Sequence, residues 1–201
     1  MTDEGRAARC RQQLAEAADA HRAAAGTLGP AVAAAAAACE AALRGGGRVL
    51  VCGNGGSAAE SQHFAAELTG RFRRERRGLP VVALTTDTSA VTAIANDYGF
   101  AEVFARQVEA LGRRGDALVA ISTSGRAANV VEAARRAKAA GLRVVAVTGP
   151  DAGPLGEQAD VVVAVPAAST ARVQEVHLTL LHAMCDEIEA ALTGEPPAPD
   201  A

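Results

Sequence analysis

Five short apolar runs, none of which alternates polar with apolar residues, constrain the fold of this chain more than any other feature. The runs cover 48–52, 80–84, 117–122, 143–148 and 161–166. A strand that is apolar at consecutive positions must be covered on both faces, as strands of parallel sheets are. Helical patterns separate the runs, which indicates βαβ crossovers. The sequence therefore predicts an α/β fold with a doubly wound, parallel, five-stranded sheet.

Helices are also predicted on either side of this sheet in the chain. Two leading helices are expected at 4–25 and 30–44, and a long final helix at 170–192. Between the strands, the predicted helices cover 57–72, 89–96 with 102–111, and 127–140. We accordingly divide the chain into an N-terminal helical segment (1–46), a sheet domain (47–194) and a flexible tail (195–201).

Charge and cysteine spacing exclude several classes of protein. The formal net charge of −3 argues against nucleic-acid binding through bulk electrostatics. The densest basic run, 71–77, is interpreted as the solvated end of a helix, where the helix dipole favours cations. Four cysteines lack any metal-binding spacing, so reduced structural thiols are expected; they are Cys10, Cys39, Cys52 and Cys185.

No targeting segment is evident in the sequence. The first residues include Asp3 and Glu4 and lack the apolar core of a secretory signal. The Ala-rich run at 31–39 is too short to span a bilayer. We therefore expect a soluble protein of the cytoplasm.

A glycine-rich segment, Cys52-Gly53-Asn54-Gly55-Gly56-Ser57, follows the first predicted strand. Glycine lets the backbone approach a ligand closely, and the free amides of a helix start favour an anion. No lysine is placed to reach a phosphate, so the segment is neither a Walker A loop nor a dinucleotide fingerprint. Taken alone, a tight strand-to-helix turn explains it equally well.

Three consecutive hydroxyl residues, Ser122, Thr123 and Ser124, follow the third predicted strand. One hydroxyl is enough to cap a helix, so three favour a second anion-binding loop. Ligands of such sheets bind at the carboxyl ends of the strands. Two such loops on neighbouring strands indicate a phosphosugar rather than a nucleotide.

His63 and Glu67 lie four residues apart in the helix after the first loop, so they project from one helix face. Such a pair is usually a surface contact that contributes a few tenths of a kcal/mol. A metal ligand pair or an acid–base pair is the functional alternative.

The final helix offers further candidates. Gln174 and His182 lie on one face at i and i+8, while His177 is turned well away from His182. Glu175 and His182 are also near one face, at i and i+7. Spacing alone does not choose between Gln174 and Glu175.

The motifs and their order resemble the SIS (sugar isomerase) domain family, which has a flavodoxin-like fold. The closer similarity is to the phosphoheptose isomerases, also called sedoheptulose 7-phosphate isomerases. It rests on "CGNGGS", "HFAAELTGRF", "IANDYGF", "ARQVEALGRRGDALVAISTSG", "VVAVTG" and "RVQEVHLTLLH". It covers nearly all of the chain after the first helix and identifies 47–194 as the SIS domain.

The resemblance implies conversion of sedoheptulose 7-phosphate to D-glycero-D-manno-heptose 7-phosphate through an enediol. It implies Glu67 as the base and His182 as the complementary acid and base. It implies one zinc ion per subunit, held by His63, Glu67, Gln174 and His182. The implied substrate-binding residues are Asn54, Gly55, Gly56, Ser57, Glu67, Asn96, Asp97, Ser122, Thr123, Ser124 and Gln174.

The resemblance also implies a homotetramer with active sites at subunit interfaces, in which the final helix of a neighbouring subunit contributes His182. The small-molecule phosphosugar is then the ligand, and neither nucleic acid nor a membrane is an expected partner. SIS domains that bind phosphosugars in regulators, or that bind a replication initiator, are the alternative. The retained Glu67 and His182 favour an enzyme over such a module.

Two positions depart from the pattern of the family. Relatives usually read Ser-Gly-Asn-Ser where this chain has Ser124-Gly125-Arg126-Ala127, so one hydroxyl is missing at Ala127. An acidic residue common in the family is absent near Arg172, and the loop there is shorter by one residue. Both departures leave the predicted reaction type unchanged.

Overall fold

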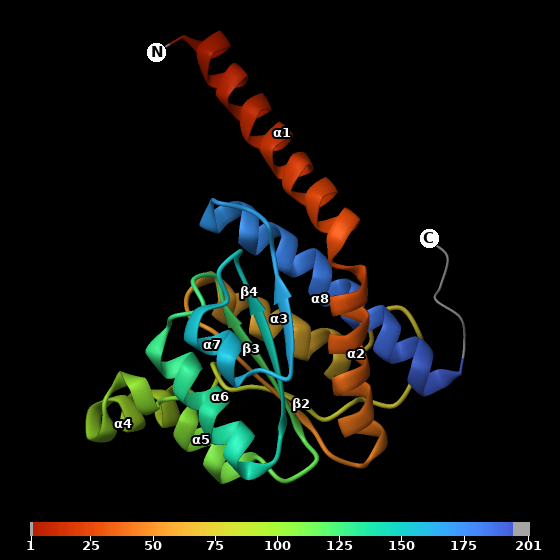
Figure 1. Cartoon of the computed structure of the whole chain (residues 1–201), viewed down its shortest axis with the longest axis vertical. Helices are drawn as coiled ribbons and strands as arrows, with labels where there is room; N and C mark the ends of the chain where they lie inside the picture. The colour runs from red at the N-terminus through yellow and green to blue at the C-terminus, as the bar shows by residue number, and fades with distance from the viewer. Residues whose placement is uncertain (1, 195–201) are drawn as a thin grey trace.

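The computed structural model describes residues 2–194 and contains one five-stranded parallel sheet (Figure 1). The strands are β1 (Val49–Cys52), β2 (Val81–Ala83), β3 (Ala117–Ser122), β4 (Arg143–Thr148) and β5 (Val161–Ala164). Their order is β2-β1-β3-β4-β5, and every neighbouring pair is parallel. The predicted fold class and all five strands are confirmed. The predicted tail, 195–201, lies outside the described residues.

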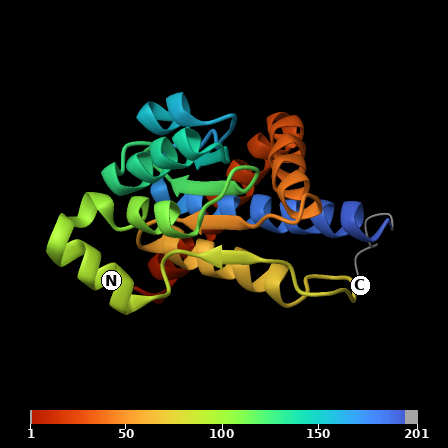
Figure 2. The same ribbon diagram turned by 90° about the horizontal axis from the view of Figure 1, so that it is seen from below.

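Both faces of the sheet are buried, which explains why its strands are apolar at consecutive positions. On β1, Val49 and Val51 pack into a core shared with the helices at 29–44, 56–69 and 170–193, whereas Leu50 and Cys52 pack into a second core with the helices at 105–111, 128–140 and 153–158. Figure 2 shows helices on both sides of the sheet. Side chains alternate between the two faces of a strand, so each face needs its own apolar set.

The helices match most of the predicted ranges. They are α1 (Asp3–Thr27), α2 (Gly29–Arg44), α3 (Gly56–Thr69), α4 (Thr88–Tyr98), α5 (Ala105–Leu111), α6 (Ala128–Ala140), α7 (Gly153–Gln158) and α8 (Thr170–Thr193), with a 3₁₀ turn at Phe100–Glu102. The short α7 was not predicted, because its sequence, GPLGEQ, contains turn-forming residues. The predicted end of α3 at residue 72 is wrong, since the helix stops before Gly70.

The interpretation of 71–77 as a solvated helix end is also wrong. This segment is irregular, and the side chains of Arg74 and Arg76 are only 4% and 6% exposed. They form ion pairs with Asp186 and Glu189 on α8. The basic residues therefore attach the end of α3 to a helix more than 100 residues later, a pairing that no local pattern reveals.

Helix α1 extends away from the rest of the chain (Figure 1). Its buried residues are Ala20 and Ala24, close to its C-terminal end, while Leu14 is 72% exposed. Among residues 2–194, no single helix meets the length and hydropathy of a membrane span. Within these residues, α1 and α2 reach that length and hydropathy only when they are combined, and the two helices meet at a bend of 74°.

The four cysteines are free, as predicted. Cys10 is exposed, whereas Cys39, Cys52 and Cys185 are buried. Burial raises the pKa of both Cys39 and Cys52 to about 12, so these thiols stay protonated near neutral pH. They act as small apolar side chains in the two cores.

The strand order identifies where a ligand would bind. β1 lies between β2 and β3. The chain first runs from β1 to β2 on one side, and then crosses back to β3, β4 and β5 on the other side. In doubly wound sheets the crevice at this switch point, outside the carboxyl ends of the strands, is the usual ligand site. Here it falls at the loops after Cys52 and Ser122.

Candidate functional site

A pocket of about 140 Å³ opens at the switch point between β1 and β3. Its lining comes from both loops and from α8, and consists of Asn54, Ser57, Ile121, Ser122, Thr123, Ser124, Ala127 and Gln174. The structure therefore brings together the two segments that the sequence predicted as anion-binding loops. No lysine or arginine lines the pocket, so an anion there would be held by hydroxyls and amides.

The two helices that start at this pocket present backbone amides without side-chain caps. No side chain caps the N-terminus of α3, which begins at Gly56, or that of α6, which begins at Ala128. Uncapped amides and the positive ends of two helix dipoles favour a phosphate in the pocket. The hydroxyls of Ser57 and Ser122 to Ser124 add further donors around it.

Asn54 is held in place by Asn129, a residue that the sequence reasoning missed. Each side-chain amide donates to the other's oxygen, at 2.8 and 2.9 Å, which ties the loop after β1 to the start of α6. Asn129 is only 3% exposed. In the sequence, Asn129 stands out only as an asparagine near the start of a predicted helix. Its position there does not reveal that its partner is Asn54.

Gln174 reaches the same pocket from α8. A Cβ atom on Gly56 would lie 2.3 Å from the Gln174 Nε2 atom, so a larger residue at position 56 would displace the end of this side chain. Gly125, with φ of +63°, plays a similar part in the second loop, where a Cβ would lie 2.1 Å from the Ala152 carbonyl oxygen. Close packing against backbone, together with a positive φ, explains Gly125, whereas Gly56 leaves space for the Gln174 side chain.

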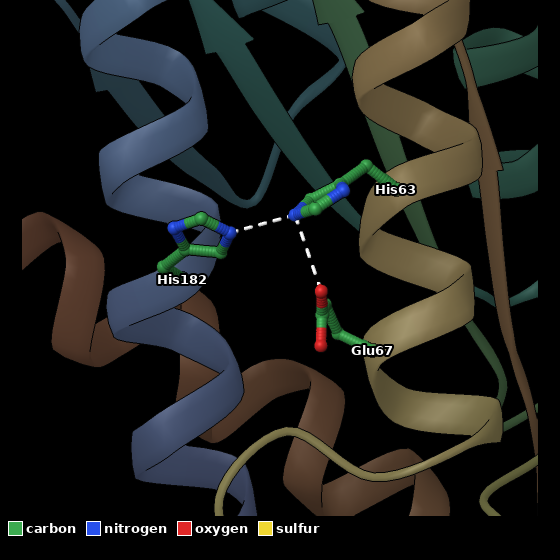
Figure 3. A group of neighbouring side chains, drawn as sticks. All are labelled: His63, Glu67 and His182. Carbon is green, nitrogen blue, oxygen red and sulfur yellow. Dashed lines mark hydrogen bonds and ion pairs between the residues drawn. The ribbon is translucent and has the colours of Figure 1, made fainter. Parts of the chain in front are cut away.

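Beside the pocket, α3 and α8 carry a cluster of three ionisable side chains, His63, Glu67 and His182 (Figure 3). The His63 Nε2 atom lies 2.7 Å from the His182 Nε2 atom and 3.3 Å from the Glu67 Oε1 atom. All three side chains are half-buried. The two helices pack side by side, which brings together residues separated by 119 positions in the sequence.

The expectation that a neighbouring subunit contributes His182 is wrong for this cluster. His63, Glu67 and His182 meet within one chain, because α8 returns across the sheet face that α3 covers. A helix of 24 residues has room to lie against its own sheet and still extend beyond it. The sequence revealed the apolar sides of α8 but not which chain covers them.

The electrostatics of the cluster favour the neutral form of the His182 imidazole. Burial lowers the pKa of His182, the nearby His63 lowers it further, and Glu67 opposes both effects. Two ring nitrogens 2.7 Å apart also leave room for only one proton between them. The contact between the two rings therefore includes one unprotonated nitrogen, and the Glu67 side chain lies 3.3 Å from the His63 Nε2 atom.

These residues fit a metal ion in chemical type. Two imidazole nitrogens and a carboxylate oxygen are common ligands of divalent transition metals, and the three atoms lie within 4.8 Å of one another. Ligand atoms around a tetrahedral ion lie about 3.3 Å apart, so the two rings would separate slightly to admit one. The structure therefore contains a possible His/Glu/His metal site.

Other predicted site residues lie apart from this cluster. Among residues 2–194, no hydrogen bond joins Gln174 to His63, Glu67 or His182; Gln174 lies over Gly56 instead. Its role as a metal ligand stays a prediction.

Asn96 and Asp97 are exposed near the end of α4, where the Asn96 amide donates to the Asp97 carboxylate. Neither residue lines the pocket at the switch point, and α4 has no buried residue among 88–98. A single chain therefore does not bring these two residues to the site. Their substrate-binding role stays a prediction.

Arg126 does not point its charge at the pocket. Its guanidinium pairs with Asp151 at 2.6 Å, and both side chains are largely exposed. Ala127, in contrast, lines the pocket, at the position where the family resemblance led us to expect a serine. The lost hydroxyl is therefore a local change in the pocket wall, and Arg126 does not compensate for it.

His177 lies outside the cluster, as its spacing on the helix predicted. It is fully buried, its Nε2 donates to the Thr148 carbonyl oxygen, and its Nδ1 lies 3.5 Å from the Glu60 Oε2 atom. This second contact between α3 and α8, which the sequence analysis missed, lies between the one at Gly56 and the one at His63. Three successive contacts thus fix the register of these two helices.

Comparison with known proteins identifies the family of this chain. The family model of the SIS domain matches residues 13–149. The phosphoheptose isomerase of Roseiflexus sp. is 56% identical over 153 residues, which cover 76% of this chain and 78% of that protein.

Two solved structures are also similar. The phosphoheptose isomerase from Neisseria gonorrhoeae matches with a TM-score of 0.85 and 49% identity, covering 90% of this chain and 97% of that one. The enzyme of the same name from Francisella tularensis matches with a TM-score of 0.88 and 39% identity, covering 94% and 98%. The chain therefore belongs to the SIS domain family and, within it, to the phosphoheptose isomerases.

Proposed function

We propose that this protein is an aldose–ketose isomerase that converts sedoheptulose 7-phosphate to D-glycero-D-manno-heptose 7-phosphate. One observation carries the proposal. A pocket suited to phosphate lies beside a cluster of two imidazoles and a carboxylate, in the same chain. A phosphosugar bound by its phosphate would extend its other end toward groups that can move protons.

The pocket supplies binding. Ser57, Ser122, Thr123 and Ser124 hold the phosphate together with the amides of Gly55 and Gly56, while Asn54 and Gln174 face the sugar hydroxyls. These groups touch a part of the substrate that does not react. Their contribution therefore acts on ground state and transition state alike.

The cluster supplies proton transfer. Glu67 removes a proton from carbon 1 of the open-chain ketose and returns it to carbon 2. His182 gives a proton to the carbonyl oxygen on carbon 2 and takes one back from the hydroxyl on carbon 1. The lowered pKa of His182 favours its neutral form, which can accept the proton from the hydroxyl on carbon 1.

Zinc is the metal that we propose for the cluster, with His63, Glu67 and His182 as ligands and Gln174 as the fourth. When bound, such an ion would polarise the carbonyl and stabilise the negative charge of the enediolate. A carboxylate bound tightly to zinc is a weaker base, so the residue that moves the proton must be free of the ion for part of the cycle.

The assembly and the location are also proposals. Exposed Leu14 and the long, largely uncovered α1 support a homotetramer in which leading helices pack between subunits. Asn96 and Asp97 would reach a substrate only across such an interface. The cytoplasm, where sugar phosphates are metabolised, is the expected compartment.

Incubation with sedoheptulose 7-phosphate in D₂O tests the reaction. Proton transfer through an enediol predicts an aldoheptose 7-phosphate that carries deuterium at carbon 2, detected by NMR spectroscopy and mass spectrometry. Binding of the sugar phosphate without turnover would instead support a non-catalytic SIS module. Product without deuterium would retain the isomerase but reject exchange of the transferred proton with solvent.

A further inference from the structure

Glu189 is a buried carboxylate that the proposed mechanism does not use. It lies on α8 seven residues after His182, so the two side chains share one face of the helix. Its side chain is fully buried. Burying a charge is costly unless it is paired and hydrogen-bonded, so its partners define what the charge does.

Five groups from the segment after α3 converge on this carboxylate. The Oε1 atom accepts from the Phe72 amide at 2.9 Å and pairs with the Arg76 guanidinium at 2.8 Å. The Oε2 atom accepts from the amides of Arg73 and Arg74 at 2.8 and 3.0 Å, and the Arg74 guanidinium lies 3.8 Å away. Three consecutive amides bound to one side chain fix the path of the chain through these residues.

The carboxylate is ionised in this setting. Burial alone would raise the pKa of Glu189, but the backbone amides of 72–74 and the Arg76 guanidinium outweigh it and hold the pKa below its usual value. We call Glu189 and the segment bound to it, 72–76, the anchor. The negative charge of Glu189 is an integral part of it.

One end of this anchor reaches His182. The segment held by Glu189 includes Phe72, whose ring stacks on the His182 imidazole with centroids 5.4 Å apart and an angle of 21° between the planes. On its other side, the His182 Nε2 atom faces His63. Phe72 therefore limits the orientations that the imidazole can adopt.

The other end reaches Glu67. The Arg76 guanidinium, while paired with Glu189, donates to the backbone carbonyls of Glu67 and Gly70 at 3.1 Å each. The last carbonyls of a helix have no partner within the helix, so Arg76 caps the end of α3 where Glu67 lies. The same carboxylate thus fixes the surroundings of both residues.

We infer that Glu189 is a positioning residue for the isomerase reaction, acting through Phe72 on His182 and through Arg76 on Glu67. The inference rests on the proposed function for its effect on turnover, whereas its effect on geometry is independent of that function. Because the anchor touches neither the pocket nor its loops, its loss should change proton transfer rather than substrate binding.

The first test is spectroscopic and needs no substrate. The face of the Phe72 ring shields the ring protons of His182, so in the intact protein these protons should resonate upfield of an unstacked histidine. The chain has four histidines, and a His182→Gln variant assigns the signal. In Glu189→Gln the upfield shift should collapse, whereas Glu187→Gln, the same change at an exposed position on α8, should leave it unchanged.

The second test is kinetic. Phe72→Leu keeps the loop anchored to Glu189 and removes only the aromatic ring. It should lower kcat on the order of tenfold or more with KM within about twofold, since misplacing a reacting group slows the chemical step. Phe72→Tyr, which retains a stacking ring, should restore kcat. This pair keeps the inference testable if Glu189→Gln does not fold.

The outcomes separate the inference from the proposed function. A Glu189→Gln protein that folds and keeps the His182 shift overturns the inference, and so does a Phe72→Leu enzyme with unchanged kcat. If the shift collapses in Glu189→Gln but the wild-type protein itself does not isomerise sedoheptulose 7-phosphate, the proposed function is rejected and the positioning of His182 by Glu189 is retained. A rise in KM without a fall in kcat would assign the anchor to substrate binding and overturn the inference.

Discussion

The pocket at the switch point and the His63–Glu67–His182 cluster are adjacent, but they are built in opposite ways. The pocket consists mainly of short loops that follow two neighbouring strands, and its lining groups are neutral. The cluster consists of ionisable side chains from two helices, joined across 119 residues of sequence. The comparison indicates that binding can be encoded locally, whereas the chemistry depends on how two distant helices pack.

The two regions also differ in how they tolerate change. A pocket that shares one phosphate among several hydroxyls and amides loses only part of its binding energy when one donor is removed. The cluster has one carboxylate and two imidazoles, and no second carboxylate among its three residues could replace Glu67. Removal of a single group there should be far more costly to turnover.

The largest effect is expected from Glu67→Gln. The substitution keeps the shape of the side chain and removes the base, so kcat should fall by a factor on the order of 10² or more. Steady-state kinetics with sedoheptulose 7-phosphate measures it. Glu75→Gln, which makes the same change at a side chain that is 90% exposed, is the matched control.

Nearly unchanged turnover in a folded Glu67→Gln protein would contradict the role of Glu67. Co-expression of the Glu67→Gln and His182→Ala variants tests whether one chain supplies both residues to the same cluster. Since one chain holds the whole cluster, every subunit of a mixed assembly keeps one broken cluster, and activity should not recover. Recovery in mixed assemblies verified by mass would mean that subunits exchange these residues.

A moderate effect is expected from Ser124→Ala in the pocket. Loss of one hydroxyl donor to the phosphate should raise KM about tenfold and change kcat much less. Ser89→Ala, at an exposed position on α4, serves as the control. A fall in kcat with constant KM would place Ser124 in the chemical step and remove the contrast between the two regions.

The smallest effect is expected from Ala127→Ser. Ala127 lines the pocket, so a serine there would add one donor and lower KM by about two- to fivefold. Titration with inorganic phosphate, followed by the increase in thermal stability on binding, provides a measure that is independent of turnover. Weaker phosphate binding by the variant would show that the pocket has no room for the hydroxyl.

Much of the fold was predictable because its signals are local. The apolar runs predicted all five strands, and the glycine and hydroxyl motifs identified both loops before their contact was known. The strand order then brings the loops together, since β1 and β3 are neighbours. Local sequence and one rule of sheet topology were sufficient for the pocket.

Contacts between distant side chains could not be predicted in the same way. Nothing near Asn54 in the sequence points to Asn129, and nothing in 71–77 distinguishes the buried Arg74 and Arg76 from solvated arginines. Their partners lie on elements more than 70 residues away. Only the packing of complete helices determines which polar groups meet.

The position of α8 in the chain has a consequence for biosynthesis. This helix carries Gln174, His182 and Glu189, and it follows all five strands. Ribosomes add roughly 5–20 residues per second, so roughly 6–24 s separate the synthesis of His63 from that of His182, 119 residues later. Once Ser124 has been made, the nascent chain has both loops that line the pocket, but it still lacks β5, Gln174 and the imidazole beside Glu67. The loop residues proposed to bind phosphate are therefore synthesised before the imidazole proposed to exchange protons with the substrate.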